Sequence, residues 1–193
     1  MIRDGALENP RPSAIMGQHV FPLLPVGKIG FREGMYMASA DEIYLKVIGK
    51  GGHGAAPDLC IDPIVIASHI IIALQQIISR NANPRQPTVL TFGNIIGQGA
   101  TNIIPNEVNI AGTFRAMNEE WRESALVKIE KMAKGIAEAM GGKCEVNISR
   151  GYPYLENNPE LTRRIRVAAE EYVGKDNVVD LEISLGAEDF SYY

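Results

Sequence analysis

The sequence has 193 residues, enough for one large domain or two small ones. Its 19 Lys and Arg against 23 Asp and Glu give a formal net charge of −4, which disfavours a nucleic-acid-binding protein because such proteins carry a basic face. The composition, 46% apolar and 22% charged residues, excludes a disordered chain. Two cysteines are too few for a disulfide-based scaffold, so we expect a soluble globular protein.

The N-terminal part of the chain is broken repeatedly by proline and glycine. Residues 1–13 are expected to form a loop, and residues 14–33, rich in β-forming side chains, are expected to form two short strands with turns between them. Alternation of apolar and polar side chains predicts a longer strand over residues 35–49. The glycine-dense segment GKGGHG follows at residues 49–54.

Residues 34–150 show one ordered series of elements. The elements expected there are a strand at 35–49, a helix from Asp62-Pro63 to about Arg80, strands at 89–97 and 107–117, a helix capped by Asn118, and a strand at 143–150. This β-α-β-β-α-β order is typical of the ferredoxin-like arrangement, one antiparallel sheet with two helices on a single face. The flanks, 1–33 and 151–193, are expected to be pieces of a second α/β unit, with a helix from Pro159 to about Val173 and a strand near 178–181.

The first of these helices is more apolar than a helix on a small sheet needs to be. Its apolar side chains are Ile64, Val65, Ile66, Ile70, Ile71, Ile72, Leu74, Ile77 and Ile78. Either the flanking unit covers the second apolar face or a second subunit does, and we favour the subunit interface. The stretch is expected to be too short to span a bilayer, so no membrane association is expected.

The three histidines differ in what their surroundings favour. His69 lies on the apolar helix and is expected to be structural. His19, expected near the end of a short strand, suits a zinc-like metal, although by position alone a structural role stands ahead. His53, among glycines, could donate a hydrogen bond to a developing oxyanion or be an idle turn residue, and the two alternatives are balanced.

Two polar residues lie in otherwise apolar segments. Asn102 lies in TNIIPNE, and Arg115 lies in GTFRAM, where a guanidinium projecting from a strand suits bidentate binding of a carboxylate. A salt bridge at the sheet edge is the alternative for Arg115 and stands slightly ahead. The sequence contains no H-E-x-x-H, C-x-x-C, P-loop or G-x-S-x-G motif, so its own residues suggest no complete metal site.

Six segments in order, GQHVFP, GKGGHGAAP, DPI, TNIIPNE, GTFRAM and GAEDFSYY, resemble peptidase family M20. The resemblance covers the whole chain and is greatest to the amidohydrolase subgroup, which cleaves N-acyl amino acids, hippurate and auxin–amino acid conjugates. It implies a two-metal α/β catalytic domain into which a βαββαβ lid is inserted. The lid would span residues 34–150, and residues 1–33 and 151–193 would belong to the catalytic domain.

The resemblance also implies roles for individual residues. His19 would be a metal ligand, and His53 would be the lid histidine that reaches a neighbouring subunit's active site and holds the scissile carbonyl oxygen. Asn102 and Arg115 would lie near the substrate, with Arg115 holding the carboxylate of the amino acid. The implied cofactor is a divalent metal, two per active site (Zn, Mn or Co), which activates water to hydrolyse an N-acyl amino acid. The implied assembly is a cytoplasmic homodimer joined through the lid.

The chain also departs from the family pattern. The other metal ligands and the general-base Glu of an adjacent Glu-Glu pair lie upstream of GQHVFP in the family, but only eighteen residues precede His19 and none forms such a pair. The last metal histidine follows the GAEDF-type motif, and this sequence ends at Tyr193. We therefore expect part of a longer enzyme that, alone, binds little or no metal and is inactive. The alternative is a stand-alone dimerisation or ligand-binding module without catalysis.

Overall fold

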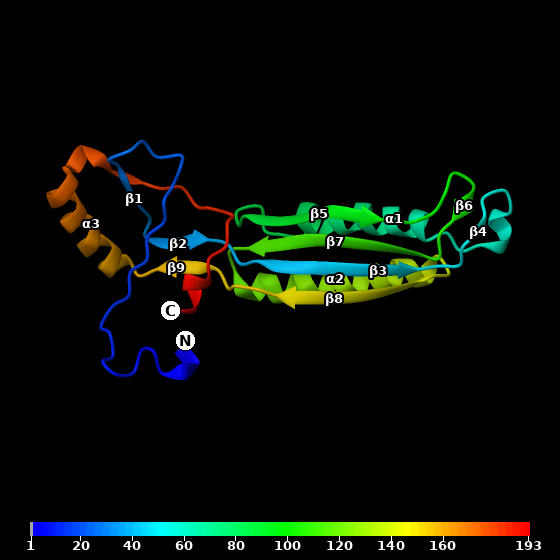
Figure 1. Ribbon diagram of the computed structural model, residues 1–193, viewed down its shortest axis with the longest axis horizontal. Helices are drawn as coiled ribbons and strands as arrows, with labels where there is room; N and C mark the ends of the chain where they lie inside the picture. The colour runs from blue at the N-terminus through cyan, green and yellow to red at the C-terminus, as the bar shows by residue number, and fades with distance from the viewer. Residues whose placement is uncertain (1) are drawn as a thin grey trace.

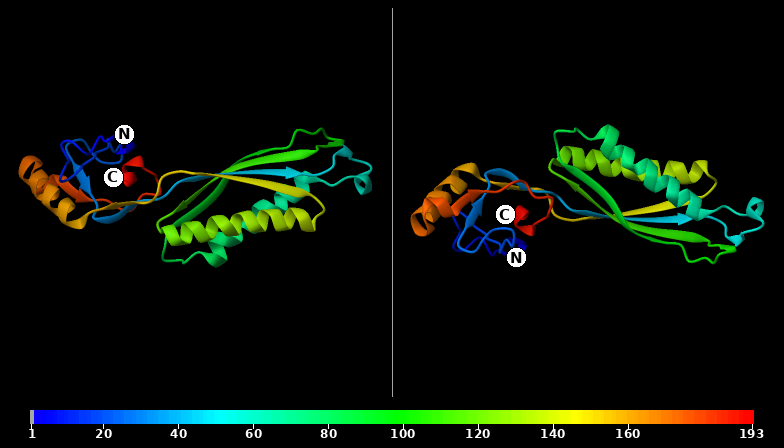
Figure 2. Two further views of the ribbon diagram at one scale, coloured as in Figure 1. Left: turned by 90° about the horizontal axis from the view of Figure 1, so that it is seen from below. Right: turned by 90° about the horizontal axis from the view of Figure 1, so that it is seen from above.

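The computed structural model describes residues 2–193 and has an elongated shape with two parts of unequal size (Figure 1). We call residues 41–150 the long unit, and residues 2–37 with 155–193 the small unit. The chain crosses between them twice, at residues 38–40 and 151–154, and we call these two crossings the neck. They run side by side, since the Ala40 amide donates to the Tyr152 carbonyl oxygen over 3.0 Å (Figure 2).

The long unit is built on one four-stranded antiparallel sheet. Its strands are β3 (Asp41–Ile48), β5 (Thr88–Ile96), β7 (Glu107–Ala116) and β8 (Lys143–Arg150). Their order across the sheet is β5-β7-β3-β8, so the first and third strands in sequence lie at the centre. This is the ferredoxin-like order, and it confirms the β-α-β-β-α-β arrangement predicted from the sequence.

Two helices cover one face of this sheet (Figure 2). The helix α1 (Pro63–Gln76) begins at Asp62, whose carboxylate accepts from the Ile64 and Val65 amides, and α1 continues into a π-helical turn, Ile77–Asn81. The helix α2 (Glu119–Ala139) begins at Asn118, whose side chain accepts from the Trp121 amide. Both predicted caps are confirmed, because each side-chain oxygen satisfies an amide that has no partner within the first helical turn.

The hydrophobic core lies between the sheet and these helices. Along β3, Ile43, Leu45 and Val47 are buried while Glu42 and Tyr44 are exposed, which is the alternation that a strand with one buried face requires. Other large, fully buried side chains of this core include Phe114 and Ile110 on β7, Ile70 and Leu74 on α1, and Ile129 on α2. Burying each such side chain stabilises the fold by roughly 1.5–3 kcal/mol, so this core holds the sheet and the two helices together.

The small unit contains two short strand pairs and a helix. Its elements are β1 (Ile29–Phe31), β2 (Gly34–Met37), β9 (Leu155–Asn157), α3 (Pro159–Val173) and β10 (Val178–Asp180), with 3-10 turns at Ile2–Asp4, Lys175–Asn177 and Asp189–Tyr192. The strands β1 and β10 pair in parallel, and β2 pairs antiparallel with β9. A third short pair, β4 (Gly52–His53) with β6 (Ile103–Ile104), forms the far tip of the long unit next to a 3-10 turn at Pro57–Leu59 (Figure 1).

Two expectations about strands are corrected by the structure. Residues 14–28 form loops and turns rather than a strand, so His19 does not lie near a strand end. Pro22 and Pro25 lack the amide hydrogen that a strand donates, and Val20 and Leu23 are 94% and 83% exposed. The strand expected at 35–49 is divided into β2 and β3 because the chain changes partners at the neck, where the Ala38 amide donates to the carbonyl oxygens of Ser184 and Gly186.

The apolar helix covers almost the range predicted for it, from Pro63 to Asn81. Within the described residues, Pro63–Asn81, with 19 residues, is the one helix that is long and apolar enough to cross a membrane by length and composition alone. The expectation that it is too short to span a bilayer is therefore wrong. One side of it, including Ile66, Ile70 and Leu74, packs into the core of the long unit. Several apolar side chains of α1 on the other side, among them Ile72, are exposed.

Candidate functional site

The predicted site residues His53 and Asn102 meet at the tip of the long unit. They lie on the paired strands β4 and β6 and the turn before β6, and the Gly54 amide donates to the Asn102 carbonyl oxygen over 2.8 Å. The glycines of this loop allow the close approach, since a Cβ on Gly51 would lie 2.5 Å from the Ile104 carbonyl oxygen. His53 is exposed at the end of the molecule that lies farthest from the small unit (Figure 1).

At the other end of the molecule, His19 contacts Glu188, a residue that sequence analysis quoted within GAEDFSYY without giving it a role. The His19 Nε2 atom lies 2.5 Å from Glu188 Oε2, and the other carboxylate oxygen accepts from the Phe190 amide over 3.2 Å. A Cβ on Gly17 would lie 3.4 Å from the Phe190 ring. The segments GQHVFP and GAEDFSYY, far apart in sequence, therefore pack directly against each other.

The charge on Glu188 is favoured by its surroundings. Partial burial raises the pKa of its carboxyl, but the hydrogen bonds from the Phe190 amide and from His19 outweigh burial, so the pKa lies below its ordinary value. A carboxylate only accepts hydrogen bonds, so a neutral His19 carries its proton on Nε2. The lone pair of His19 then lies on Nδ1.

Arg115 lies at the neck end of β7, next to the same segment of the small unit. Its Nη1 atom donates to the Leu185 carbonyl oxygen over 3.0 Å, three residues before Glu188. The strand β7 is a central strand of the sheet, so Arg115 does not lie at a sheet edge, where the alternative salt bridge was expected. Instead, the guanidinium joins the long unit to the loop that carries the partner of His19.

The four predicted site residues thus form two groups at opposite ends of one copy of the chain. The ten residues of β7, Glu107–Ala116, run from the tip to the neck, and ten extended residues span about 30 Å. His53 and Asn102 lie at one end of this length, and His19 and Arg115 lie at the other (Figure 1). One copy of the chain therefore does not bring all four side chains into a single site.

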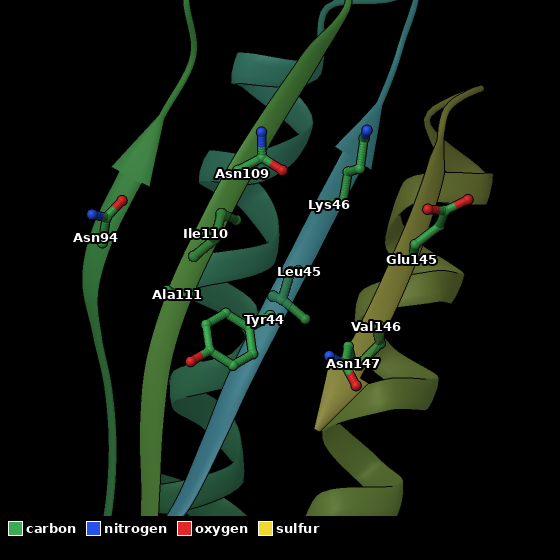
Figure 3. A pocket seen from close by; sticks show the side chains of 10 residues that line it. All are labelled: Tyr44, Leu45, Lys46, Asn94, Asn109, Ile110, Ala111, Glu145, Val146 and Asn147. Carbon is green, nitrogen blue, oxygen red and sulfur yellow. The ribbon is translucent and has the colours of Figure 1, made fainter. Parts of the chain in front are cut away.

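The face of the sheet opposite the helices is lined mainly by polar side chains. Figure 3 shows a shallow groove there, lined by polar side chains from all four strands, among them Asn94, Asn109, Tyr44 and Asn147. Lys46 on this face pairs with Glu107 over 2.8 Å. Exposed polar side chains of this kind are ordinary for the solvent face of an antiparallel sheet.

The described residues do not by themselves fit a metal centre. Within residues 2–193, no three His, Cys, Asp or Glu side chains are grouped so that they could hold a metal ion, whereas a catalytic zinc needs three protein ligands. The two cysteines, Cys60 and Cys144, are free. Cys60 lies at the tip, where its Sγ donates to the Ala56 carbonyl oxygen over 3.5 Å, and Cys144 is buried in the core. Burial raises the pKa of the Cys144 thiol to about 11, which keeps it in its neutral form.

A ferredoxin-like unit joined through two crossings to a smaller α/β unit defines a class of two-part α/β proteins, and the sequence identifies the family within it. Residues 39–141 match the peptidase dimerisation domain of family M20, and the chain belongs to this family. This agrees with the resemblance drawn from the six sequence segments.

The relatives of this chain are hydrolases of bacteria. Along its whole length the chain is 38% identical to an N-acetyl-L-cysteine deacetylase of Bacillus subtilis, of which it covers 45%, and 36% identical to an N-acetyldiaminopimelate deacetylase of Bacillus cytotoxicus, of which it covers 51%. The chain therefore spans about half the length of these curated relatives.

A solved structure extends the comparison to the fold. The whole chain superimposes with a TM-score of 0.76 and 31% identity on 47% of the Bacillus subtilis YXEP protein, described as a dinuclear metal-binding peptidase of family M20. The family therefore includes enzymes that bind two metal ions, and the mixed α/β fold of this chain is that of M20 peptidases.

Proposed function

We propose that this chain forms the lid and part of the catalytic unit of an amidohydrolase that removes the acyl group from N-acyl amino acids. The lid lies within residues 34–150, and residues 1–33 and 151–193 belong to the catalytic unit. Deacetylation by two relatives supports the reaction and the substrate class. The observation that supports the proposal is the separation of His53 and Asn102 from His19 and Arg115, because only an active site shared by two copies would bring all four side chains together.

The surface that suits this homodimer is continuous along α1 and β5. Ile64, Val65 and Ile72 are 42–72% exposed on α1, and Ile95 and Ile96 are 52% and 47% exposed on β5. The two elements adjoin, since a Cβ on Gly97 would lie 3.4 Å from Ile64 Cγ1. The strand β5 is also an edge strand, whose unpaired backbone groups can hydrogen-bond to a second copy across a two-fold axis.

In such a dimer, His53 and Arg115 act on different parts of one substrate. The imidazole of His53, delivered by the lid of the second copy, donates a hydrogen bond to the oxygen of the scissile carbonyl, and Asn102 lies beside it. The guanidinium of Arg115 exchanges the Leu185 carbonyl oxygen for the substrate carboxylate, which it can bind with two parallel hydrogen bonds. His19 would be one ligand of a divalent metal through Nδ1, among ligands that the described residues do not complete.

Other features of the chain agree with a metabolic enzyme of the cytoplasm. The net charge of −4 does not suit nucleic acid, and the relatives are bacterial hydrolases that act on small molecules by their names. The partners proposed are therefore a second copy of the chain, the N-acyl amino acid and divalent metal (Zn, Mn or Co).

The test compares two proteins on a panel of N-acetyl amino acids with added zinc or manganese. One is the 193-residue chain, which is expected to bind little metal and to be inactive. The other is a chimera in which the chain replaces the matching segment of the Bacillus subtilis N-acetyl-L-cysteine deacetylase, and it is expected to hydrolyse the panel. In the chimera, Arg115→Met is expected to raise KM at least about tenfold, because a charged hydrogen bond contributes about 1.5–3 kcal/mol.

Circular dichroism and the sedimentation coefficient check that the chimera is folded and dimeric. A folded, dimeric chimera that hydrolyses no N-acyl amino acid contradicts the proposal. Binding of N-acetyl amino acids by the 193-residue chain without hydrolysis by the chimera favours the stand-alone binding module instead. An unchanged KM in Arg115→Met contradicts the carboxylate role of Arg115 alone.

A further inference from the structure

In the loop after β4, the backbone amides of residues 54–56 each donate a hydrogen bond within the tip. The Gly54 amide donates to the Asn102 carbonyl oxygen, and the Ala56 amide donates to the His53 carbonyl oxygen over 2.9 Å. Between them, the Ala55 amide donates to the Nδ1 atom of the His53 ring over 3.1 Å. The turn at residues 53–56 therefore holds both the backbone and the imidazole of His53.

The direction of the Ala55 hydrogen bond determines the protonation pattern of the ring. A backbone amide nitrogen only donates, so His53 Nδ1 must offer its lone pair. In a neutral imidazole one nitrogen carries the proton and the other accepts, so the proton of His53 lies on Nε2. We propose that the Ala55 amide fixes the Nε2–H tautomer of His53, so that the outward nitrogen is always a hydrogen-bond donor.

This inference deepens the proposed function, on which its chemical consequence rests. A free imidazole exchanges between two tautomers, and only one of them presents a donor at Nε2. An oxygen acceptor such as an amide carbonyl needs that donor, and a donor that is already oriented needs no reorganisation as charge develops on the oxygen. Ala55 is thus a positioning residue, acting through its backbone on His53.

The test is nuclear magnetic resonance on the 193-residue chain with labelled histidine and backbone nitrogen, at a pH of about 8.5, where an ordinary histidine is neutral. A long-range ¹H–¹⁵N correlation reports the tautomer of His53, assigned by its loss in His53→Gln. The wild-type chain is expected to show the Nε2–H tautomer alone. It is also expected to show a ¹⁵N–¹⁵N coupling between the Ala55 amide and His53 Nδ1.

Two variants separate the hydrogen bond from the side chain of Ala55. Ala55→Gly keeps the amide hydrogen and is expected to retain both signals. Ala55→Pro removes it and is expected to lose the coupling and to show both tautomers. A wild-type ring protonated on Nδ1, a missing coupling in the wild-type chain, or a single Nε2–H tautomer in a folded Ala55→Pro chain overturns the inference. Because the resting chain is measured, an inactive chimera with the expected tautomer contradicts the proposed function and leaves this inference standing.

Discussion

At the scale of single residues, the neck is held by a buried ion pair that sequence analysis did not find. Asp41 and Arg122 are 1% and 5% exposed, and two hydrogen bonds of 2.7 Å join the guanidinium to both carboxylate oxygens. Arg122 also donates to the Gly151 carbonyl oxygen, and Glu119 accepts both from Arg122 and from the Tyr154 amide. The hydrogen bonds that Arg122 donates to Asp41 raise the pKa of Arg122 above its ordinary value. The first turn of α2 is thereby tied to the start of β3 and to the second crossing of the neck.

Replacing one member of this pair is expected to lower the free energy of unfolding far more than replacing both. Arg122→Leu leaves the Asp41 carboxylate buried without a charged partner, so the free energy of unfolding is expected to fall by about 3–5 kcal/mol. The double variant Asp41→Leu with Arg122→Leu is expected to recover a large part of that loss. Urea unfolding of the 193-residue chain measures both.

The matched control is Arg150→Leu, which removes an arginine whose pair with Glu123 is exposed to solvent. Its effect is expected to be much smaller, because solvent screens exposed ion pairs. Equal losses in Arg122→Leu and Arg150→Leu, or a double variant less stable than Arg122→Leu, contradict the assigned role of the buried pair.

The same scale shows which site residues the sequence could reveal. His53 stands out because glycines surround it, and Arg115 because its strand is otherwise apolar. Glu188 could not be paired with His19, since 169 residues separate them and no local pattern links the two segments. The pairing of Arg122 with Asp41 was hidden for the same reason, since Asp41 lies 81 residues earlier.

At the scale of elements, local chemistry sets the start of α1. The Asp62 carboxylate accepts from the Ile64 amide over 2.8 Å and from the Val65 amide over 3.3 Å. Asp62→Ala is therefore expected to lower the free energy of unfolding by about 0.5–2 kcal/mol, the range for loss of a helix N-cap.

Thermal or urea unfolding of the 193-residue chain checks this value. Asp58→Ala is the control, since Asp58 lies in a neighbouring 3-10 turn that has no side-chain cap. An Asp62→Ala chain as stable as the Asp58→Ala chain contradicts the capping role.

Elements whose signals are local were predictable, and elements that depend on distant partners were not. Both long helices begin at the caps that the sequence indicates, and β5, β7 and β8 lie within a residue or so of their predicted ranges. The strand expected at 35–49 is divided because β2 pairs with β9 while β3 pairs with β7 and β8. The alternation of apolar and polar side chains over residues 35–49 does not indicate where the chain changes from one pairing strand to another.

At the scale of the whole molecule, the long unit holds His53 and Arg115 at its opposite ends, although the proposed reaction needs both side chains at one substrate. The order of elements, the family and the interrupted architecture could be inferred from the sequence, but the distance between the tip and the neck could not, because it depends on how β7 runs through the sheet. His53 at the tip and Arg115 at the neck can serve one substrate only if a second copy delivers the tip. The proposed active site therefore depends on a homodimer formed through α1 and β5.

The most direct test of this claim is the mass of the 193-residue chain in solution, measured by sedimentation equilibrium for the wild-type chain and two variants. Ile72 is 72% exposed on α1, and Val127 is 65% exposed on α2, away from the proposed interface. The wild-type chain and Val127→Asp are expected to have twice the 21.1 kDa mass of one chain, and Ile72→Asp is expected to be a monomer. A monomeric wild-type chain at micromolar concentrations, or a dimer that Ile72→Asp leaves intact and Val127→Asp dissociates, contradicts the account.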